Sequence, residues 1–168
     1  MIVTDKKILR TMSNEWNGNL QQLEEIVDKM GEAMEKYKGV GISAIQVGLP
    51  YRIFLAGPVD SPELVMNPKI LEKSPFMKSD WEGCLSCPNT MVKIKRAKNI
   101  TLEYTSVRKG EFVKVKRKFT DFDARVIQHE LDHLDGVNYM TRAKKIHMDQ
   151  AKRKQKLIGR KLKRMQLA

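Results

Sequence analysis

The clearest chemical pattern in the sequence is a pair of histidines with a glutamate between them. Residues His129-Glu130-Leu131-Asp132-His133 form an H-E-x-x-H motif. On a helix, two histidines four residues apart lie on the same face, so both can bind one metal ion. Glu130 points to the side by about 100°, where its carboxylate can reach a water at the metal without binding the metal itself. The plainer alternative is a helix whose surface histidines make salt links to neighbouring acids.

Two histidines are too few for a catalytic metal site, which usually has three protein ligands and one open position. Cys84, in the segment Glu82-Gly83-Cys84-Leu85-Ser86, is a candidate for the third ligand. The spacing alone also allows Cys84 and Cys87 to join both histidines in a closed Cys₂His₂ structural zinc site. A closed site activates no water, whereas a site without Cys87 is open and suited to hydrolysis.

Composition limits the kinds of protein that this chain can be. The 168 residues, of which 41% are hydrophobic, are enough for one core and too few for two full domains. A run of about 18 apolar residues does not occur, and the segment Met1–Arg10 lacks the apolar stretch of a signal peptide. The two cysteines lie too close together to join distant parts of a fold and fit a reducing compartment. We therefore expect a soluble, cytoplasmic monomer that does not contact membranes.

The net charge of +12 is concentrated at the C-terminus. Residues 141–168 contain eleven lysines or arginines and one acid, Asp149, so this segment carries +10 and residues 1–140 carry about +2. Apolar residues spaced along one side of the segment predict a helix. They are Ile146, Ala151, Leu157, Ile158, Leu162 and Met165. We expect a domain of residues 1–140 followed by a basic helical tail of residues 141–168.

Hydrophobic periodicity predicts the elements that position the motif. Apolar residues at steps of three and four predict a helix over 19–37, which we expect Gly39 to end. Residues 39–48 are too rich in glycine for a helix and too small-sided for a core strand, so we expect backbone that another chain can approach closely.

Strands and a second helix follow this segment. Strands are predicted over 51–55, 64–66, 91–95, 100–105 and 112–119, with a hairpin turn at Lys109-Gly110. Thr120 and Asp123 predict a capping box for a second helix that runs toward Gly136 and carries the H-E-x-x-H motif. This order of elements predicts an α+β fold.

Three separate segments, taken together, resemble one family. Residues 39–46 (Gly-Val-Gly-Ile-Ser-Ala-Ile-Gln), 82–86 (Glu-Gly-Cys-Leu-Ser) and 128–133 (Gln-His-Glu-Leu-Asp-His) are similar, in this order, to the three signature motifs of peptide deformylases. The resemblance covers residues 21–140. The chain departs from the usual first motif at Ile42-Ser43, a small change. The resemblance implies short mixed strands around a central metal-bearing helix, with further helices at the two ends of the chain.

The resemblance also implies the chemistry and the residues that carry it. Cys84, His129 and His133 would bind one divalent metal per chain, with a water in the fourth position and Cys87 outside the site. Fe²⁺ would be the native ion, and Zn²⁺, Ni²⁺ or Co²⁺ its substitutes. Glu130 would act as general base and then general acid while formate is removed from the N-terminal formyl-methionine of a nascent polypeptide. The Gln46 side-chain amide and the Leu85 backbone N–H would stabilise the oxyanion.

Residues next to the three motifs would bind the substrate. Gly41 would let an extended peptide add as a strand, and apolar neighbours would line a slot for the methionine side chain. The residues expected to bind substrate are Val40, Gly41, Trp81, Glu82, Gly83, Phe122 and Val126. Arg125 would be an unusual lining residue, with its aliphatic stem in the slot and its charged head in water.

Other classes of protein explain parts of this sequence. An RNA-binding protein with a structural zinc would account for the charge and the four ligand-type residues, but it would give Gln46 and Glu130 no role. A metalloprotease would take its third ligand downstream of the helix, where only His147 occurs. We otherwise expect His147 to be solvated. The basic tail either binds ribosomal RNA near the point where nascent chains emerge or is a solvated helix packed on the domain.

Overall fold

The computed structural model describes residues 1–166, with side chains described for residues 1–158 and 160. The helices and strands of this part of the chain are η1 (Ile8–Arg10), α1 (Leu20–Lys36), β1 (Gly41–Ser43), η2 (Ala44–Val47), β2 (Ile53–Ala56), β3 (Glu63–Lys73), β4 (Met77–Cys84), β5 (Cys87–Ala97), β6 (Asn99–Arg108), β7 (Glu111–Thr120), α2 (Asp121–Leu134), η3 (Tyr139–Arg142) and α3 (Lys145–Gln166). The α+β class is confirmed. No helix in the described part is long and apolar enough to cross a membrane.

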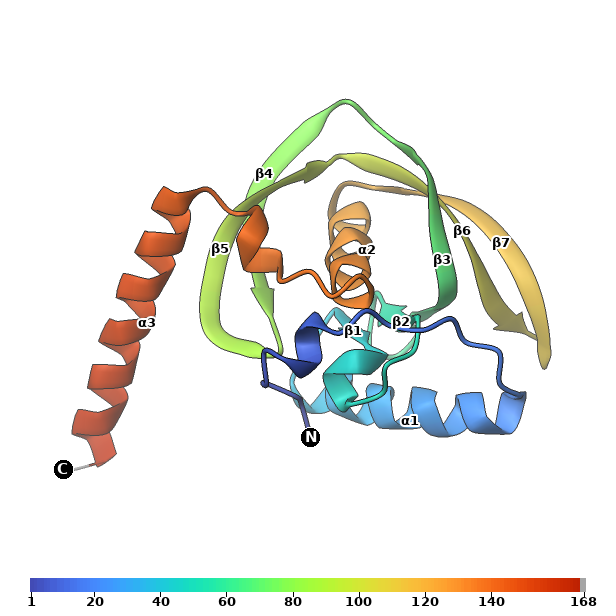
Figure 1. Ribbon diagram of the computed structural model, residues 1–168, viewed down its shortest axis with the longest axis horizontal. Coiled ribbons are helices and arrows are strands. Elements are labelled where there is room, and N and C mark those ends of the chain that lie inside the picture. Colours follow the sequence, from blue (N-terminus) through green and yellow to red (C-terminus); the bar gives the residue numbers. More distant parts are fainter. Residues whose placement is uncertain (167–168) are drawn as a thin grey trace.

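Two antiparallel sheets surround the central helix α2. The larger sheet has the strand order β1-β2-β3-β6-β7, and β4 and β5 form a separate two-stranded sheet. Figure 1 shows α2 between the β4–β5 ribbon on one side and β3, β6 and β7 on the other, with α1 below and α3 beyond β5. Because α2 is enclosed in this way, it is buried almost throughout from Ala124 to Leu134.

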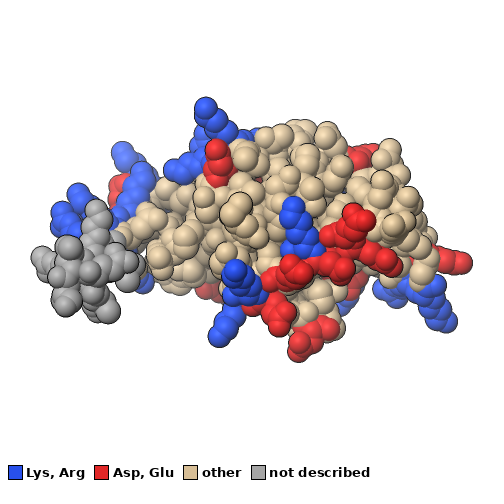
Figure 2. Space-filling view, turned by 90° about the horizontal axis from the view of Figure 1, so that it is seen from below, with Lys and Arg blue, Asp and Glu red and all other residues tan. Residues whose placement is uncertain are grey.

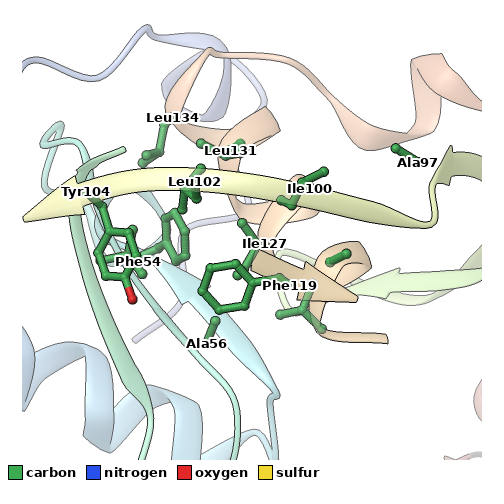
Figure 3. Packing of buried hydrophobic residues seen from close by; sticks show 13 residues of the cluster. Phe54, Ala56, Ala97, Ile100, Leu102, Tyr104, Phe119, Ile127, Leu131 and Leu134 are labelled. Atoms are coloured by element: carbon green, nitrogen blue, oxygen red, sulfur yellow. The ribbon is translucent and has the colours of Figure 1, made fainter. Parts of the chain in front are cut away.

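The main core lies between the larger sheet and α2. Alternate residues of β6 point inward, as the two-residue period of a strand requires. Figure 3 shows Leu102 of β6, Phe54 of β2 and Phe119 of β7 packed near Ile127 and Leu131 of α2. A second core lies between α1 and the strands β1 and β2. Together they fix α2 relative to β1.

Helix α1 buries the apolar stripe predicted for it, but its C-terminus is not formed by Gly39 as expected. Asn19 caps the N-terminus, because its side chain accepts a hydrogen bond from the Gln22 N–H at 3.0 Å and Gln22 returns one to the Asn19 N–H at 3.1 Å. At the other end Lys38, and not Gly39, takes the left-handed conformation, with φ 52°. The Gly39 N–H then bonds the Met34 carbonyl at 2.9 Å, which completes a Schellman end.

Several strands differ from their predictions. Residues 41–43 form a buried strand paired with β2, so the prediction that residues 39–48 hold no core strand was wrong. Strand β4 was missed, and β3 and β5 are each 11 residues long, well beyond the ranges predicted for them. The turn at Lys109-Gly110 is confirmed, with φ values of 52° and 78°. Helix α2 begins after Thr120 as predicted, but the Thr120 side chain makes no capping bond, so the capping box was wrong.

The basic segment forms helix α3, as predicted, and its first turns pack on β5. Ala151 is buried with Val92 and Ile94 of β5, whereas the side chains of Ile146 and Leu157 are 61% and 63% exposed. The predicted apolar stripe is therefore only partly covered, and the side chains of Leu162 and Met165 lie outside the described residues. His147 is not simply solvated as expected, because its ring lies 6.4 Å from that of Trp81 in a T-shaped arrangement.

Candidate metal centre and substrate cavity

The H-E-x-x-H residues are buried on α2. His129, Glu130 and His133 are each less than 10% exposed, and the two imidazole rings lie 5.1 Å apart. The alternative of two surface histidines is therefore wrong. Desolvation by burial, followed by the electrostatic effects of His129 and Arg96, lowers the pKa of His133 to about 3. His133 is thus neutral at physiological pH, which is the form of imidazole that binds metals.

Cys84, at the end of β4, lies next to these histidines. Its Sγ is 3.2 Å from His133 Nε2, and the ligand atoms of Cys84, His129 and His133 all lie within 4.8 Å of one another. In the described part of the chain, this is the one group of ligand-type residues close enough to hold a metal ion, and Cys87 is not in it. A thiolate and two imidazoles suit zinc or ferrous iron, so the donor set fits one divalent metal.

Cys87 lies across the β4–β5 turn, where its Cα pairs with that of Cys84. Cys87 also lines the cavity, but it does not belong to the group whose ligand atoms lie within 4.8 Å of one another, which favours the open three-ligand site over the closed Cys₂His₂ site. An open position is what a metal needs to activate a water.

Glu82 contacts the imidazole ring of His129. Glu82 Oε2 is 3.1 Å from His129 Nδ1, which leaves Nε2 as the ring nitrogen available to bind a metal. Arg96 donates to both Glu82 oxygens at 2.7 and 2.8 Å, and Arg125 donates to Oε1. Burial alone would raise the pKa of Glu82, but its hydrogen bonds with His129 and Arg96, together with the charge of Arg96, lower the pKa to about 2. A carboxylate behind a metal-binding histidine fixes the orientation of the imidazole ring.

The sequence analysis missed this network of charged side chains. Arg96 also donates to Asp132 at 2.9 Å, and Asp132 accepts two further bonds from Arg142 at 2.7 and 2.6 Å. The expectation that the head of Arg125 stays in water was wrong, because Arg125 is 7% exposed and bonds the carbonyl oxygens of Ile94 and Lys78. Buried acids on β4 and α2 were the available signal, since such acids need partners.

Ser43 positions Glu130, another contact that the sequence analysis missed. The Ser43 hydroxyl donates to Glu130 Oε2 at 2.6 Å. Burial raises the pKa of Glu130, against the lowering effects of His129 and Ser43. A Cβ added at Gly41 would lie 2.6 Å from Glu130 Oε1 and 2.8 Å from Val126. Gly41 is therefore required by its neighbours in the fold, independently of any substrate.

Gln46, on η2, has its amide orientation fixed by the backbone. Its Oε1 accepts a hydrogen bond from the Ser43 N–H at 3.0 Å. Its Nε2 therefore points the other way, 3.5 Å from Cys84 Sγ and 3.1 Å from Ser86 Oγ. An amide N–H₂ group beside the candidate metal ligands is a fixed hydrogen-bond donor.

A cavity of about 410 Å³ opens in front of these residues. His129, Glu130, Gln46, Cys84 and Leu85 line it, whereas His133 does not. All seven residues that the sequence analysis expected to bind substrate also line it: Val40, Gly41, Trp81, Glu82, Gly83, Phe122 and Val126. It further includes Asn89, Thr90 and Met91 of β5, for which the sequence gave no motif. The chemical groups and the cavity thus form one site.

Comparison with known proteins places this site in a family. The family model for polypeptide deformylases matches residues 1–149, which is most of the chain. The chain belongs to the peptide deformylase family. It is 43% identical to the peptide deformylase of Thermotoga neapolitana over 124 residues, 74% of each protein.

Solved deformylase structures share the fold. A crystal structure of peptide deformylase from Plasmodium falciparum has a TM-score of 0.85 at 28% identity, covering 97% of both chains. The Met-Ala-Ser-bound crystal structure of the class I type b enzyme from Acinetobacter baumannii has a TM-score of 0.76 at 30% identity, covering 84% of this chain and 96% of that one. This deformylase is therefore a metallo-hydrolase that removes N-formyl groups from nascent peptides.

Proposed function

We propose that this deformylase acts on N-terminal formyl-methionine through the residues that meet at the inner end of the 410 Å³ cavity. The observation that carries the proposal is that Glu130, Gln46, Cys84 and His129 line this cavity from three separate segments of the chain, with His133 grouped beside Cys84 and His129 just outside its lining. Cys84, His129 and His133 would hold one divalent metal, Fe²⁺ natively, with Zn²⁺, Ni²⁺ or Co²⁺ as substitutes. When bound, such an ion lowers the pKa of a water toward neutrality and polarises a carbonyl oxygen.

Glu130 is the proton carrier in this proposal. It accepts the proton of the water that attacks the formyl carbon and delivers it to the departing amine, so that formate and a free N-terminus result. The bond from Ser43 holds one carboxylate oxygen, and burial raises the pKa of the group. A raised pKa makes Glu130 a stronger base than an exposed glutamate and lets it keep the proton until the C–N bond breaks.

Gln46 and Leu85 stabilise the oxyanion that forms on the attacked carbon. The Gln46 amide is already oriented by Ser43, so it needs no rearrangement in the transition state. Leu85 directly follows Cys84 and lines the same cavity, which supports its backbone N–H as the second donor to the oxyanion. Loss of one such donor typically lowers kcat by about 10²- to 10³-fold.

The apolar part of the cavity takes the methionine side chain. Val40, Phe122, Val126 and Trp81 supply apolar surface, while Glu82 and Gly83 form the wall leading to Cys84. The Acinetobacter baumannii enzyme, which binds Met-Ala-Ser, supports a peptide that begins with methionine as the occupant. We propose that the enzyme is active as a monomer, since one chain supplies all three candidate metal ligands.

Formate release is the test of this function. The protein is purified without oxygen, its metal content is measured, and formate is assayed with formyl-Met-Ala-Ser. We expect activity with about one metal per chain, and a loss of at least about 10²-fold in kcat for Glu130→Gln, since general acid–base groups contribute 10²–10⁴.

The matched control is Glu32→Gln, an exposed glutamate on α1 that should retain full activity. Glu130→Gln should also retain its metal, because Glu130 lies outside the ligand group. A fully metallated wild-type protein that releases no formate would overturn the proposed roles.

We further propose that residues 141–168 are a basic appendage of the catalytic domain 1–140 and bind ribosomal RNA in the cytoplasm, where nascent chains emerge. Lys152, Arg153, Lys154 and Lys156 are all exposed on α3. Figure 2 shows the molecule from below the view of Figure 1. On this face Lys and Arg gather at the end formed by α3, while Asp and Glu gather over α1. Phosphate contacts by such residues are sequence-independent and release counterions. The free cysteines Cys84 and Cys87 fit a reducing compartment.

Co-sedimentation with ribosomes at several salt concentrations tests the appendage. We expect binding at low salt that weakens steeply as salt rises. Replacing Lys152, Arg153 and Lys156 by glutamate should abolish it. The same reversal at Lys114, Lys116 and Lys118 on β7 should have little effect. Equal losses in the two variants, or none in either, would reject specific binding by α3.

A further inference from the structure

A second cavity adjoins the catalytic one. It has a volume of about 420 Å³ and lies between the β4–β5 ribbon and α3, where Trp81, Met91, Gln150, Ala151 and Lys154 line it. Trp81 and Met91 line the catalytic cavity as well. These two side chains are 50% and 45% exposed, so they form a shared rim that a bound chain can cross.

Packing fixes the position of α3 beside this rim. Ala151 is 6% exposed and buried against Val92 and Ile94. One turn earlier, the His147 ring lies against Trp81. Residues three and four apart lie on the same helix face, so Gln150 and Lys154 share the face of His147 and Ala151. The outer wall of the second cavity is therefore a part of α3 that packs against β5 and carries the basic side chain of Lys154.

A substrate of this enzyme is the start of a long chain, and the residues after the methionine must leave the catalytic cavity through an opening. A third cavity, of about 390 Å³, shares Val40, Phe122 and Val126 with the catalytic one and is lined by Glu63, Asp123 and Arg117, charges of both signs. The cavity beside α3, by contrast, has Lys154 as its charged lining residue, and the exposed Lys152, Arg153 and Lys156 lie on the same helix.

We propose that the cavity between α3 and the β4–β5 ribbon is an exosite for the substrate residues that follow the first few, and that it favours acidic side chains there. This inference rests on the proposed function and names a further part of its substrate. Trp81 and Met91 guide the chain over the rim, and Lys154 attracts its carboxylates. The attraction is between solvent-exposed charges, so it acts mainly on binding and is screened by salt.

Three peptides test the exosite: formyl-Met-Ala-Ser, the same sequence extended by three aspartates, and the same sequence extended by three lysines. At low salt we expect kcat/KM to be about three-fold higher for the aspartate peptide than for the lysine peptide, as exposed ion pairs allow. The difference should lie in KM and disappear near 1 M salt, where the Debye length is about 3 Å. Lys154→Glu should reverse the preference and leave formyl-Met-Ala-Ser turnover unchanged.

The control variant is Arg117→Glu, the same charge change at the third cavity. It should leave the preference as in the wild type. A wild type without the preference, a preference that survives Lys154→Glu, or one that reverses in Arg117→Glu would each overturn the exosite. Failure of the wild type on formyl-Met-Ala-Ser would instead count against the proposed function, so the two ideas fail on different peptides.

Discussion

Glu82 is the residue on which the charged groups behind the candidate metal centre converge. Two arginines and His129 contact its carboxylate, and it is 6% exposed. A single carboxylate between two guanidinium groups is held firmly, since charge-assisted bonds are about twice as strong as neutral ones. The orientation of His129 is thus set through Glu82 by residues on β5 and α2.

Removing the charge of Glu82 should therefore weaken metal binding. We expect Glu82→Gln to lower metal affinity by about 10- to 100-fold, the usual range for the partner of a ligating histidine. Competition with a chelator, followed by metal analysis, measures this directly. Glu103→Gln, an exposed change on β6, should leave affinity unaltered. An affinity of Glu82→Gln within two-fold of wild type would contradict the role.

Only some site residues can be predicted from the sequence, and the range of their contacts explains why. His129, Glu130 and His133 are recognised because a helix brings residues four apart together. Ser43 contacts Glu130 across 87 positions of sequence, and its small, polar side chain matches no local pattern. Arg125 looked like a solvent-exposed residue because its acidic partner lies on another element, β4.

At the scale of elements, whether a helix or strand could be predicted from the sequence depended on how clearly its segment shows a hydrophobic period. Helix α1 and the β6–β7 hairpin were predicted because apolar residues or a turn dipeptide mark them. Strand β4 was missed because only Glu82 among its eight residues is buried, and it is held by its pairing with β5. Lys38 was missed as the left-handed residue because glycine is the usual choice for that position.

The cap at Asn19 gives a prediction at this scale. Asn19→Ala removes a hydrogen bond to the Gln22 N–H and should lower the free energy of unfolding by about 1 kcal/mol. Urea denaturation followed by circular dichroism measures the change. Gln21→Ala, in the exposed first turn of the same helix, should have almost no effect. Equal unfolding midpoints for Asn19→Ala and the wild type would show that the cap contributes nothing.

At the scale of the whole molecule, the start of the basic segment is tied to the body and the rest extends past it. Arg142 bonds the buried Asp132 twice, Ala143 pairs with Ile94, and Ala151 completes a core cluster. From Lys152 to Leu157 every side chain is exposed. The excess of basic residues therefore begins near Arg142, whereas close packing against the body continues to Ala151.

Two truncations separate these contributions. Deleting residues 141–168 should lower the free energy of unfolding by at least about 2 kcal/mol, because Asp132 loses charged hydrogen bonds and the β5 cluster loses its cover. Deleting residues 156–168 should change it by no more than about 0.5 kcal/mol. Thermal and urea unfolding of both proteins measures the difference. Equal stabilities would show that α3 is attached only through its chain connection.

The hairpin between β6 and β7 has a practical use. Its tip, at Lys109-Gly110, and helix α3 lie at opposite ends of the molecule in Figure 1. Glu111, next to the turn, is exposed. A linker attached at position 111 would anchor the protein to a sensor surface at a point away from the catalytic cavity and from the cavity beside α3. An immobilised molecule would then present its basic helix to a flowing solution of ribosomes.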